Sequence, residues 1–147
     1  MNSVPYGLSK GLLLEESGEL LPWFSSLHQI TKKGGKPMPT KGRTSQLFWE
    51  SETVLGGLRV SVQAMQRGSS GIFFLDIKHP KKFGSAKEEY EYDVGLLKEK
   101  FGEPTKTGSS EGYPWVRWKW DGITLNLGVA DRFMEYVAFS LSKGAIE

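Results

Sequence analysis

Alternating apolar and polar residues run through most of the chain after residue 44 and predict β-strands. In Leu58–Met65 every second side chain is apolar, which is typical of a strand with one buried face. A glycine-rich stretch, Arg67–Gly71, separates it from the next alternating segment, so the two should form a hairpin. The predicted strands are Ser45–Ser51, Leu58–Met65, Ile72–Lys78, Pro114–Trp120, Ile123–Gly128 and Met134–Leu141.

A different spacing, in steps of three and four residues, predicts one main helix between these two groups of strands. The apolar stripe consists of Tyr90, Val94, Leu97 and Phe101. Ser85 is the expected N-cap, with Glu88 completing a capping box, and Gly102 and Pro104 should end the helix. Acidic residues at 88, 89, 91 and 93 complement the helix dipole, and we expect them to form a solvated face.

The resulting order, β-β-β-α-β-β-β, predicts an α+β fold. We expect an antiparallel sheet of about five to six strands, with the helix at about Ser85–Phe101 packed on one face. The 147 residues fit a single domain, 1–147. Residues 45–147 should form its core, and residues 1–44 a loosely structured N-terminal segment. Within that segment, apolar residues at 21, 24, 27 and 30 predict a short helix.

The stretch YPWVRWKWDG, residues 113–122, holds three of the five tryptophans and two cations. Such a stretch can be a platform for nucleic-acid bases or a strand of the sheet. The Asp121-Gly122 dipeptide predicts a two-residue hairpin turn, and the turn fixes the register of the flanking strands. Trp120 then pairs with Ile123, Trp118 with Leu125 and Val116 with Leu127. We therefore expect Trp118 and Trp120 to lie in the core.

The opposite face of the same hairpin is polar and supplies the candidate binding residues. Arg117 pairs with Asn126, Lys119 lies beside them, and Trp115 faces Gly128 with space above its ring. Two interpretations of Trp115 stay open: it contacts a partner, or the N-terminal segment covers it. The candidate interface is Trp115, Arg117, Lys119 and Asn126.

The basic excess of the protein lies in a glycine- and proline-rich loop, residues 32–43. Residues 1–43 carry a net charge of +3 and the remainder −1, which gives +2 for the chain. This composition is typical of a solvated connection, or of an arm that contacts phosphates or an acidic protein surface. The cations of the loop are Lys32, Lys33, Lys36, Lys41 and Arg43.

The sequence contains no recognisable catalytic, cofactor or metal motif. It has no cysteine, which excludes disulfides, thiol nucleophiles and cysteine-based metal sites. The two histidines, His28 and His79, form no ligand motif with each other. We expect no cofactor, no metal and no membrane span. A cytoplasmic location fits this composition, although removal of a signal peptide would leave the same chain.

Three classes of function remain. The first is a non-catalytic protein-binding module, for example an inhibitor or immunity-type partner of another protein, because Trp and Arg are favoured at interfaces. The second is nucleic-acid binding through the basic loop 32–43 and the Arg117/Lys119 face. The third is an enzyme whose site uses scattered residues such as His79, Asp76 or Glu135. An unpaired strand edge also permits a homodimer.

Overall fold

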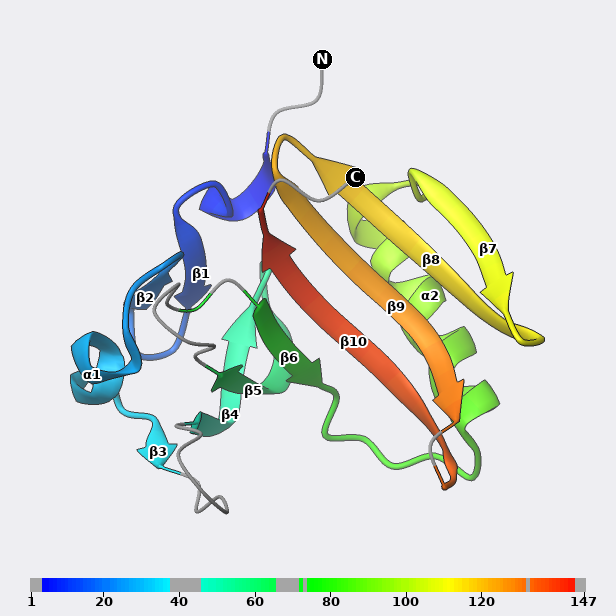
Figure 1. Cartoon of the computed structure of the whole chain (residues 1–147), viewed down its shortest axis with the longest axis horizontal. Coiled ribbons are helices and arrows are strands. Elements are labelled where there is room, and N and C mark those ends of the chain that lie inside the picture. Colours follow the sequence, from blue (N-terminus) through cyan, green and yellow to red (C-terminus); the bar gives the residue numbers. More distant parts are fainter. Residues whose placement is uncertain (1–3, 38–45, 66–71, 73, 132, 145–147) are drawn as a thin grey trace.

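The computed structural model describes residues 4–37, 46–65, 72, 74–131 and 133–144 of the chain. One antiparallel sheet organises it (Figure 1). The strands follow the order β3 (Lys36–Pro37), β4 (Gln46–Val54), β5 (Leu58–Met65), β6 (Phe74–Lys78), β10 (Glu135–Lys143), β9 (Ile123–Asp131), β8 (Tyr113–Trp120) and β7 (Lys106–Ser110). Two meanders therefore meet at the central β6–β10 pair, and helix α2 (Ala86–Phe101) connects them in the chain.

The fold is an α+β arrangement, as predicted, but the expected sheet of five to six strands is wrong. The sheet has eight strands, and its order differs from the expected one. The strands that alternation missed, β3 and β7, form the two edges. β3 is only two residues long, and every residue of β7 is exposed, so neither contains an apolar alternation. The predicted turn at 67–71 lies outside the described residues.

The described part of the N-terminal segment, residues 4–37, is not loosely structured. Strands β1 (Gly11–Leu14) and β2 (Glu19–Pro22) form a hairpin, preceded by the turn η1 (Pro5–Gly7). The predicted helix over residues 21–30 is wrong in its first part, because Leu21 and Pro22 belong to β2. Only α1 (Leu27–Ile30) is helical, and Ser26 and Gln29 form its capping box. A second turn, η2 (Thr31–Lys33), follows directly.

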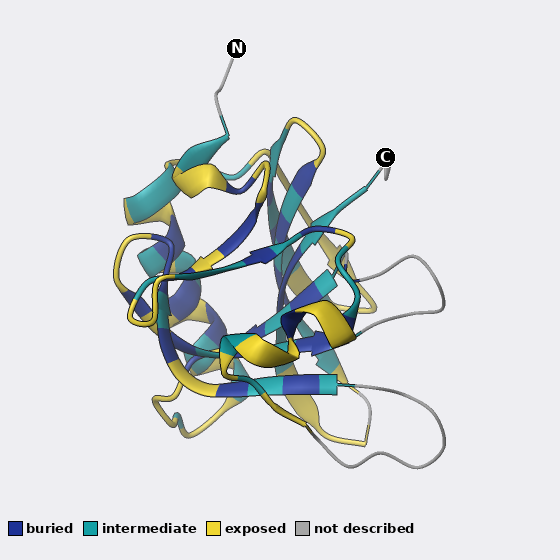
Figure 2. Ribbon diagram, turned by 90° about the vertical axis from the view of Figure 1, so that its left-hand side faces the viewer, coloured by how far each residue is buried: buried dark blue, intermediate teal, exposed yellow. Residues whose placement is uncertain are grey.

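The core lies against one face of the sheet, and two elements cover that face. Its strands contribute a row of directly paired apolar residues, which therefore share a face: Trp118, Leu125, Leu141, Leu75, Ala64 and Leu47. Helix α2 packs on β9 and β10, behind the strands in Figure 1. The β1–β2 hairpin packs beside β4, and its buried leucines join the same core. Figure 2 colours the ribbon by how far each residue is buried.

Helix α2 begins and ends at the predicted residues, but its inner face contains a buried carboxyl group. Ser85 accepts a hydrogen bond from the Glu88 amide at 3.2 Å, which confirms the N-cap, while no return bond from Glu88 to the Ser85 amide completes the box. Gly102 ends the helix as predicted: its φ is 79° and its amide closes the last turn on the Lys98 carbonyl, but its ψ of −160° is not that of a left-handed cap. Asp93, expected in solvent, is only 1% exposed.

In the described part of the chain, Asp93 is the one residue with buried side-chain polar atoms that lack a hydrogen-bond partner. Both of its carboxylate oxygens are unpaired. Burial raises the pKa of Asp93 to about 7, and the negative charge of the nearby Glu89 carboxylate contributes to this rise. The prediction of a wholly solvated acidic face was wrong because Asp93 lies three residues after Tyr90 and four before Leu97, on the buried side of the helix.

Among the described residues, no helix is long and apolar enough to cross a membrane.

Candidate functional site

A single row of side chains crosses the uncovered face of the sheet from edge to edge. Directly paired residues of antiparallel strands lie on the same face, so the register defines this row. From β7 to β3 its members are Lys106, Arg117, Asn126, Ser140, Asp76, Gln63, Phe48 and Lys36. At about 4.8 Å per strand the row is roughly 34 Å long. We call the surface formed by β6, β10, β9 and β8 on this side the open face.

Arg117, at the centre of β8, is fixed from two sides. Its Nε donates a hydrogen bond to Asn126 Oδ1 at 2.8 Å. Its guanidinium also lies over the indole ring of Trp115, 4.3 Å from the ring centroid. The predicted cross-strand pair of Arg117 and Asn126 is therefore present, and a cation–π contact adds to it. Three of the four candidate interface residues form one connected group.

Trp115 packs over two glycines, and the described β1–β2 hairpin does not cover it, because the hairpin packs on the core face of the sheet. Gly128 is opposite it in β9, as predicted, and Gly108 is opposite it in β7. A Cβ atom at Gly108 would lie 2.4 Å from the indole. Because Gly108 has no side chain, the Trp115 ring can lie over the edge strand β7. The ring is half-buried, and the Arg117 guanidinium lies over it.

The open face is hollowed between β8 and β6. The hollow has a volume of about 320 Å³. Its walls carry cations on one side and a carboxylate on the other, with hydroxyl and amide groups on β9 and β10 between them. The lining residues are Phe74, Asp76, Arg117, Lys119, Thr124, Asn126, Ala138, Ser140 and Ser142.

The cationic side of this hollow extends to the edge of the sheet. Lys106 pairs with Arg117, and Lys119 lies two residues further along β8. Among the described residues, none of these three cations has an acidic partner within ion-pair distance. We call Lys106, Arg117 and Lys119 the basic corner. Lys106 was not recognisable as a site residue from the sequence, because no pattern predicts β7.

The described cations of the basic loop 32–43 do not join the basic corner. Lys36 ends the row at the opposite edge of the sheet, and it pairs with Glu50 at 3.9 Å. Lys33 pairs with Glu19 at 3.4 Å. Lys32 is exposed, and Lys41 and Arg43 lie outside the described residues. Lys36, the described loop cation in the row, is thus separated from the basic corner by most of the width of the sheet.

The other two tryptophans of the 113–122 stretch face the core side, as the register predicted. Trp118 is buried, and its Nε1 donates to the Gly102 carbonyl at 3.0 Å, which ties the end of α2 to β8. Trp120 is only half-buried, so its expected core position is partly wrong. It lies at the rim of the core, in edge contact with Phe101 at 5.1 Å between centroids.

The residues of the enzyme hypothesis do not converge. Asp76 lies on the open face opposite Ser140, whereas Glu135 is five residues away along β10, about 17 Å. Glu135 and Asp131 accept from the Tyr113 hydroxyl at 3.0 and 3.2 Å. His79 is buried, contacts the ring of Tyr92, and accepts from the Lys81 amide.

The described residues contain no group of three or more histidine, aspartate or glutamate side chains that could hold a metal ion. His28 is exposed on α1. The hydroxyl groups of Ser140 and Ser142 were also missed as site residues. Their alternation with Phe139 and Leu141 was the available signal, since it sends both serines to the face opposite the core.

The comparisons with known proteins are negative: the chain matches no protein-family model, and neither the curated proteins nor the solved structures contain a significant match. The function must therefore be argued from the open face itself.

Proposed function

We propose that the protein is a non-catalytic binding module that holds another protein on the open face of its sheet, in the manner of an inhibitor or immunity-type protein. The observation that carries this proposal is the fixed guanidinium of Arg117. Its Nε is occupied by Asn126, and within the described residues no hydrogen bond is found for its two terminal amino groups. These groups form a planar fork that suits a carboxylate of the partner.

The cost of ordering this fork is met before the partner arrives. Immobilising a long side chain at an interface costs about 0.5–1.5 kcal/mol, and Arg117 is already held by Trp115 and Asn126. Tryptophan and arginine are also the residues that most often dominate interface energies. A fixed pair of these two residues beside a polar hollow supports a binding surface.

The charges of the open face define the partner that fits. The basic corner of Lys106, Arg117 and Lys119 favours acidic side chains above β7 and β8. Hydroxyl and amide groups on β9 and β10 favour polar side chains above the hollow. We therefore propose that the open face binds an acidic surface of another protein, and that this protein works in the cytoplasm.

Affinity capture with matched variants tests this proposal. Wild-type protein and the variants Trp115→Ala and Arg117→Ala are immobilised and exposed to an extract of the source cells. Lys87→Ala on α2 is the control, because it removes one exposed cation far from the open face. We expect a defined set of proteins to be lost with both open-face variants and retained with the control. Capture that is the same for all four proteins would refute the proposal.

Arg117→Lys separates charge from geometry in the same experiment. Lysine keeps the positive charge but cannot form the fork or stack in the same way. The proposal predicts that Arg117→Lys behaves like Arg117→Ala rather than like wild type.

Nucleic-acid binding is the alternative, and the unpaired cations of the basic corner favour it over an enzyme. Phosphate contacts by three cations would give binding that weakens steeply with salt. Filter binding with single-stranded and duplex nucleic acid at low and moderate salt distinguishes the two. Salt-sensitive binding that Lys106→Ala and Lys119→Ala abolish would replace the protein partner with nucleic acid.

A further inference from the structure

The turn between β9 and β10 presents an apolar tip. Phe133 is fully exposed, and the neighbouring Met134 is 73% exposed. Phe133 also has a φ of 85°, a conformation that bulky residues rarely adopt. Two large apolar side chains are thus held in solvent at the end of a hairpin whose two strands are nine residues long each. A feature of this kind is typical of a contact that is buried in an assembly.

Acidic groups flank the tip. The Tyr113 hydroxyl lies within 3.2 Å of an Asp131 carboxylate oxygen and 3.0 Å of a Glu135 carboxylate oxygen, which gathers both carboxylates at the base of the turn. Residues 131–135 carry a net charge of −1, with Arg132 included; Arg132 itself lies outside the described residues. The tip is therefore apolar at its end and acidic at its base.

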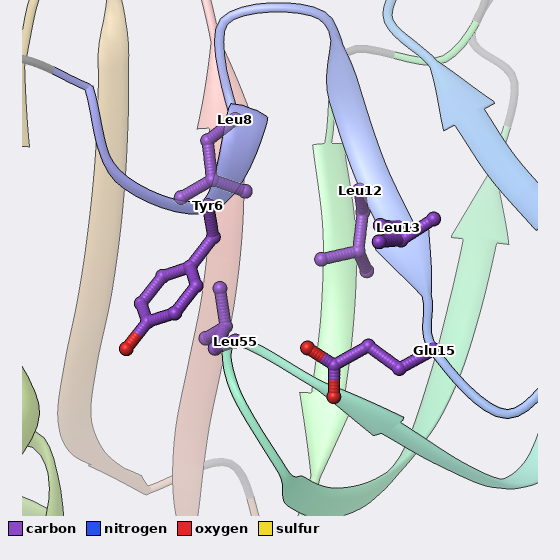
Figure 3. Close-up of a pocket in the computed structure, with 6 residues that line it drawn as sticks. All are labelled: Tyr6, Leu8, Leu12, Leu13, Glu15 and Leu55. Carbon is purple, nitrogen blue, oxygen red and sulfur yellow. The ribbon is translucent and has the colours of Figure 1, made fainter. Parts of the chain in front are cut away.

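An apolar socket, drawn in Figure 3, lies beside η1, at the opposite end of the molecule from the β9–β10 turn (Figure 1). Leu8, Leu12 and Leu55 are buried in its floor, whereas Tyr6 and Leu13 are 46% and 41% exposed at its rim. Its volume is about 170 Å³. A cavity of about 150 Å³ with a similar lining accommodates benzene, so this socket has room for one aromatic ring.

Lysines surround the socket. Lys100 Nζ donates to the Gly56 carbonyl at 3.2 Å, next to Leu55 of the floor. Lys143 Nζ donates to the Ser9 carbonyl at 2.7 Å, next to Leu8. Lys10 is exposed one residue further along the chain. The one carboxylate of the socket, Glu15, is already occupied by two backbone amides of the β4–β5 turn.

We propose that Phe133 of one copy of the protein enters this socket of a second copy. The ring fits the volume, and the acidic base of the tip meets the lysines around the socket. Insertion within one chain is excluded, because β10 separates the two features. It runs from Glu135 beside the tip to Lys143 beside the socket, about 27 Å.

This contact is heterologous, since each copy uses two different surfaces. Copies then join head to tail, as open chains or closed rings. The open face takes no part in the contact, so the inference does not depend on the proposed function and the two are tested separately.

Sedimentation velocity over a wide concentration range tests the association. We expect wild-type protein to form oligomers as its concentration rises, and Phe133→Ser to weaken association by at least about tenfold, as expected when one of the few residues that dominate an interface is truncated. Phe24→Ser is the matched control, because Phe24 is also an exposed phenylalanine with positive φ but does not line the socket. Circular dichroism verifies that each variant is folded.

Mixing two defective variants tests the head-to-tail geometry. Phe133→Ser lacks the tip, and Leu13→Arg blocks the rim of the socket with a bulky cation. Each should be monomeric alone, yet the mixture should form dimers and nothing larger, because each dimer retains one intact contact and two dead ends.

Three results would overturn the inference. Wild-type protein that stays monomeric at the highest attainable concentration would do so. Equal effects of Phe133→Ser and Phe24→Ser would also do so, as would a mixture that stays monomeric. Flotation of a monomeric wild-type protein with phosphatidylcholine vesicles, lost in Phe133→Ser, would instead assign the tip to a lipid surface.

Discussion

Replacing Asp93 with asparagine should stabilise the protein at neutral and alkaline pH. The carboxyl group is buried without a hydrogen-bond partner, and its pKa is raised from 3.8 to about 7. A raised pKa means that the folded state favours the neutral acid. The stability that this gives is complete below about pH 4 and is lost as the pH rises to about 7.

The size of the loss follows from the shift. One pKa unit corresponds to 1.36 kcal/mol, so a shift of about three units corresponds to about 4 kcal/mol. Asparagine has nearly the shape of aspartic acid and never ionises. The variant should therefore match wild type near pH 4 and exceed it by up to about 4 kcal/mol near pH 8.

Urea unfolding at about pH 4 and about pH 8 measures this difference. Glu91→Gln is the control, because Glu91 is an exposed carboxylate on the same helix. It should leave the pH dependence of stability almost unchanged. Glu89→Gln should reduce the pH dependence in part, since Glu89 contributes to the raised pKa of Asp93. If Asp93→Asn and wild type show the same pH dependence, the assignment of a buried, unpaired carboxylate is wrong.

Three further substitutions test other contacts of the structure. Gly108→Val should displace the Trp115 ring, because a Cβ atom at position 108 would lie 2.4 Å from the ring. Tryptophan fluorescence should then shift and partner capture should fall. Because residue 108 lies on an exposed edge strand, the free energy of unfolding should change by less than about 1 kcal/mol. Glu15→Ala should lower the free energy of unfolding by about 1–2 kcal/mol, because it removes the acceptor of two turn amides; unchanged urea stability would contradict this. The hydrogen bond to Glu135 raises the pKa of the Tyr113 phenol to about 12, so Tyr113→Phe should remove a phenol that titrates near pH 12. A spectrophotometric titration in which the variant instead loses a phenol with the ordinary pKa of 10 would rule this out.

The sequence predicted best where local chemistry decides the structure. The Asp121-Gly122 turn sets the register of β8 and β9, and all three apolar pairs predicted from it are present. The helix behind the sheet was likewise predictable from Ser85, the apolar stripe and Gly102. The face shared by Arg117 and Asn126 followed from the same count along the hairpin.

Structure that depends on distant parts of the chain was not predictable in this way. The pairing of β6 with β10 places Asp76 and Ser140 in one row with Arg117, and no local pattern indicates that pairing. The polar edge strand β7 is held by its ladder with β8 rather than by burial of its own side chains. In the N-terminal segment, spacing by threes suggested a helix, whereas pairing of β1 with β2 determined the fold.

Lysine acetylation of the protein with and without its captured partner tests the central claim most directly. Lys119 lies on the open face and Lys106 lies beside it on the edge strand β7, whereas Lys87 and Lys98 lie on helix α2 behind the sheet. Binding on the open face predicts that the partner protects Lys106 and Lys119 and leaves the two helix lysines fully reactive. Protection of Lys87 and Lys98, with Lys106 and Lys119 still reactive, would contradict the account.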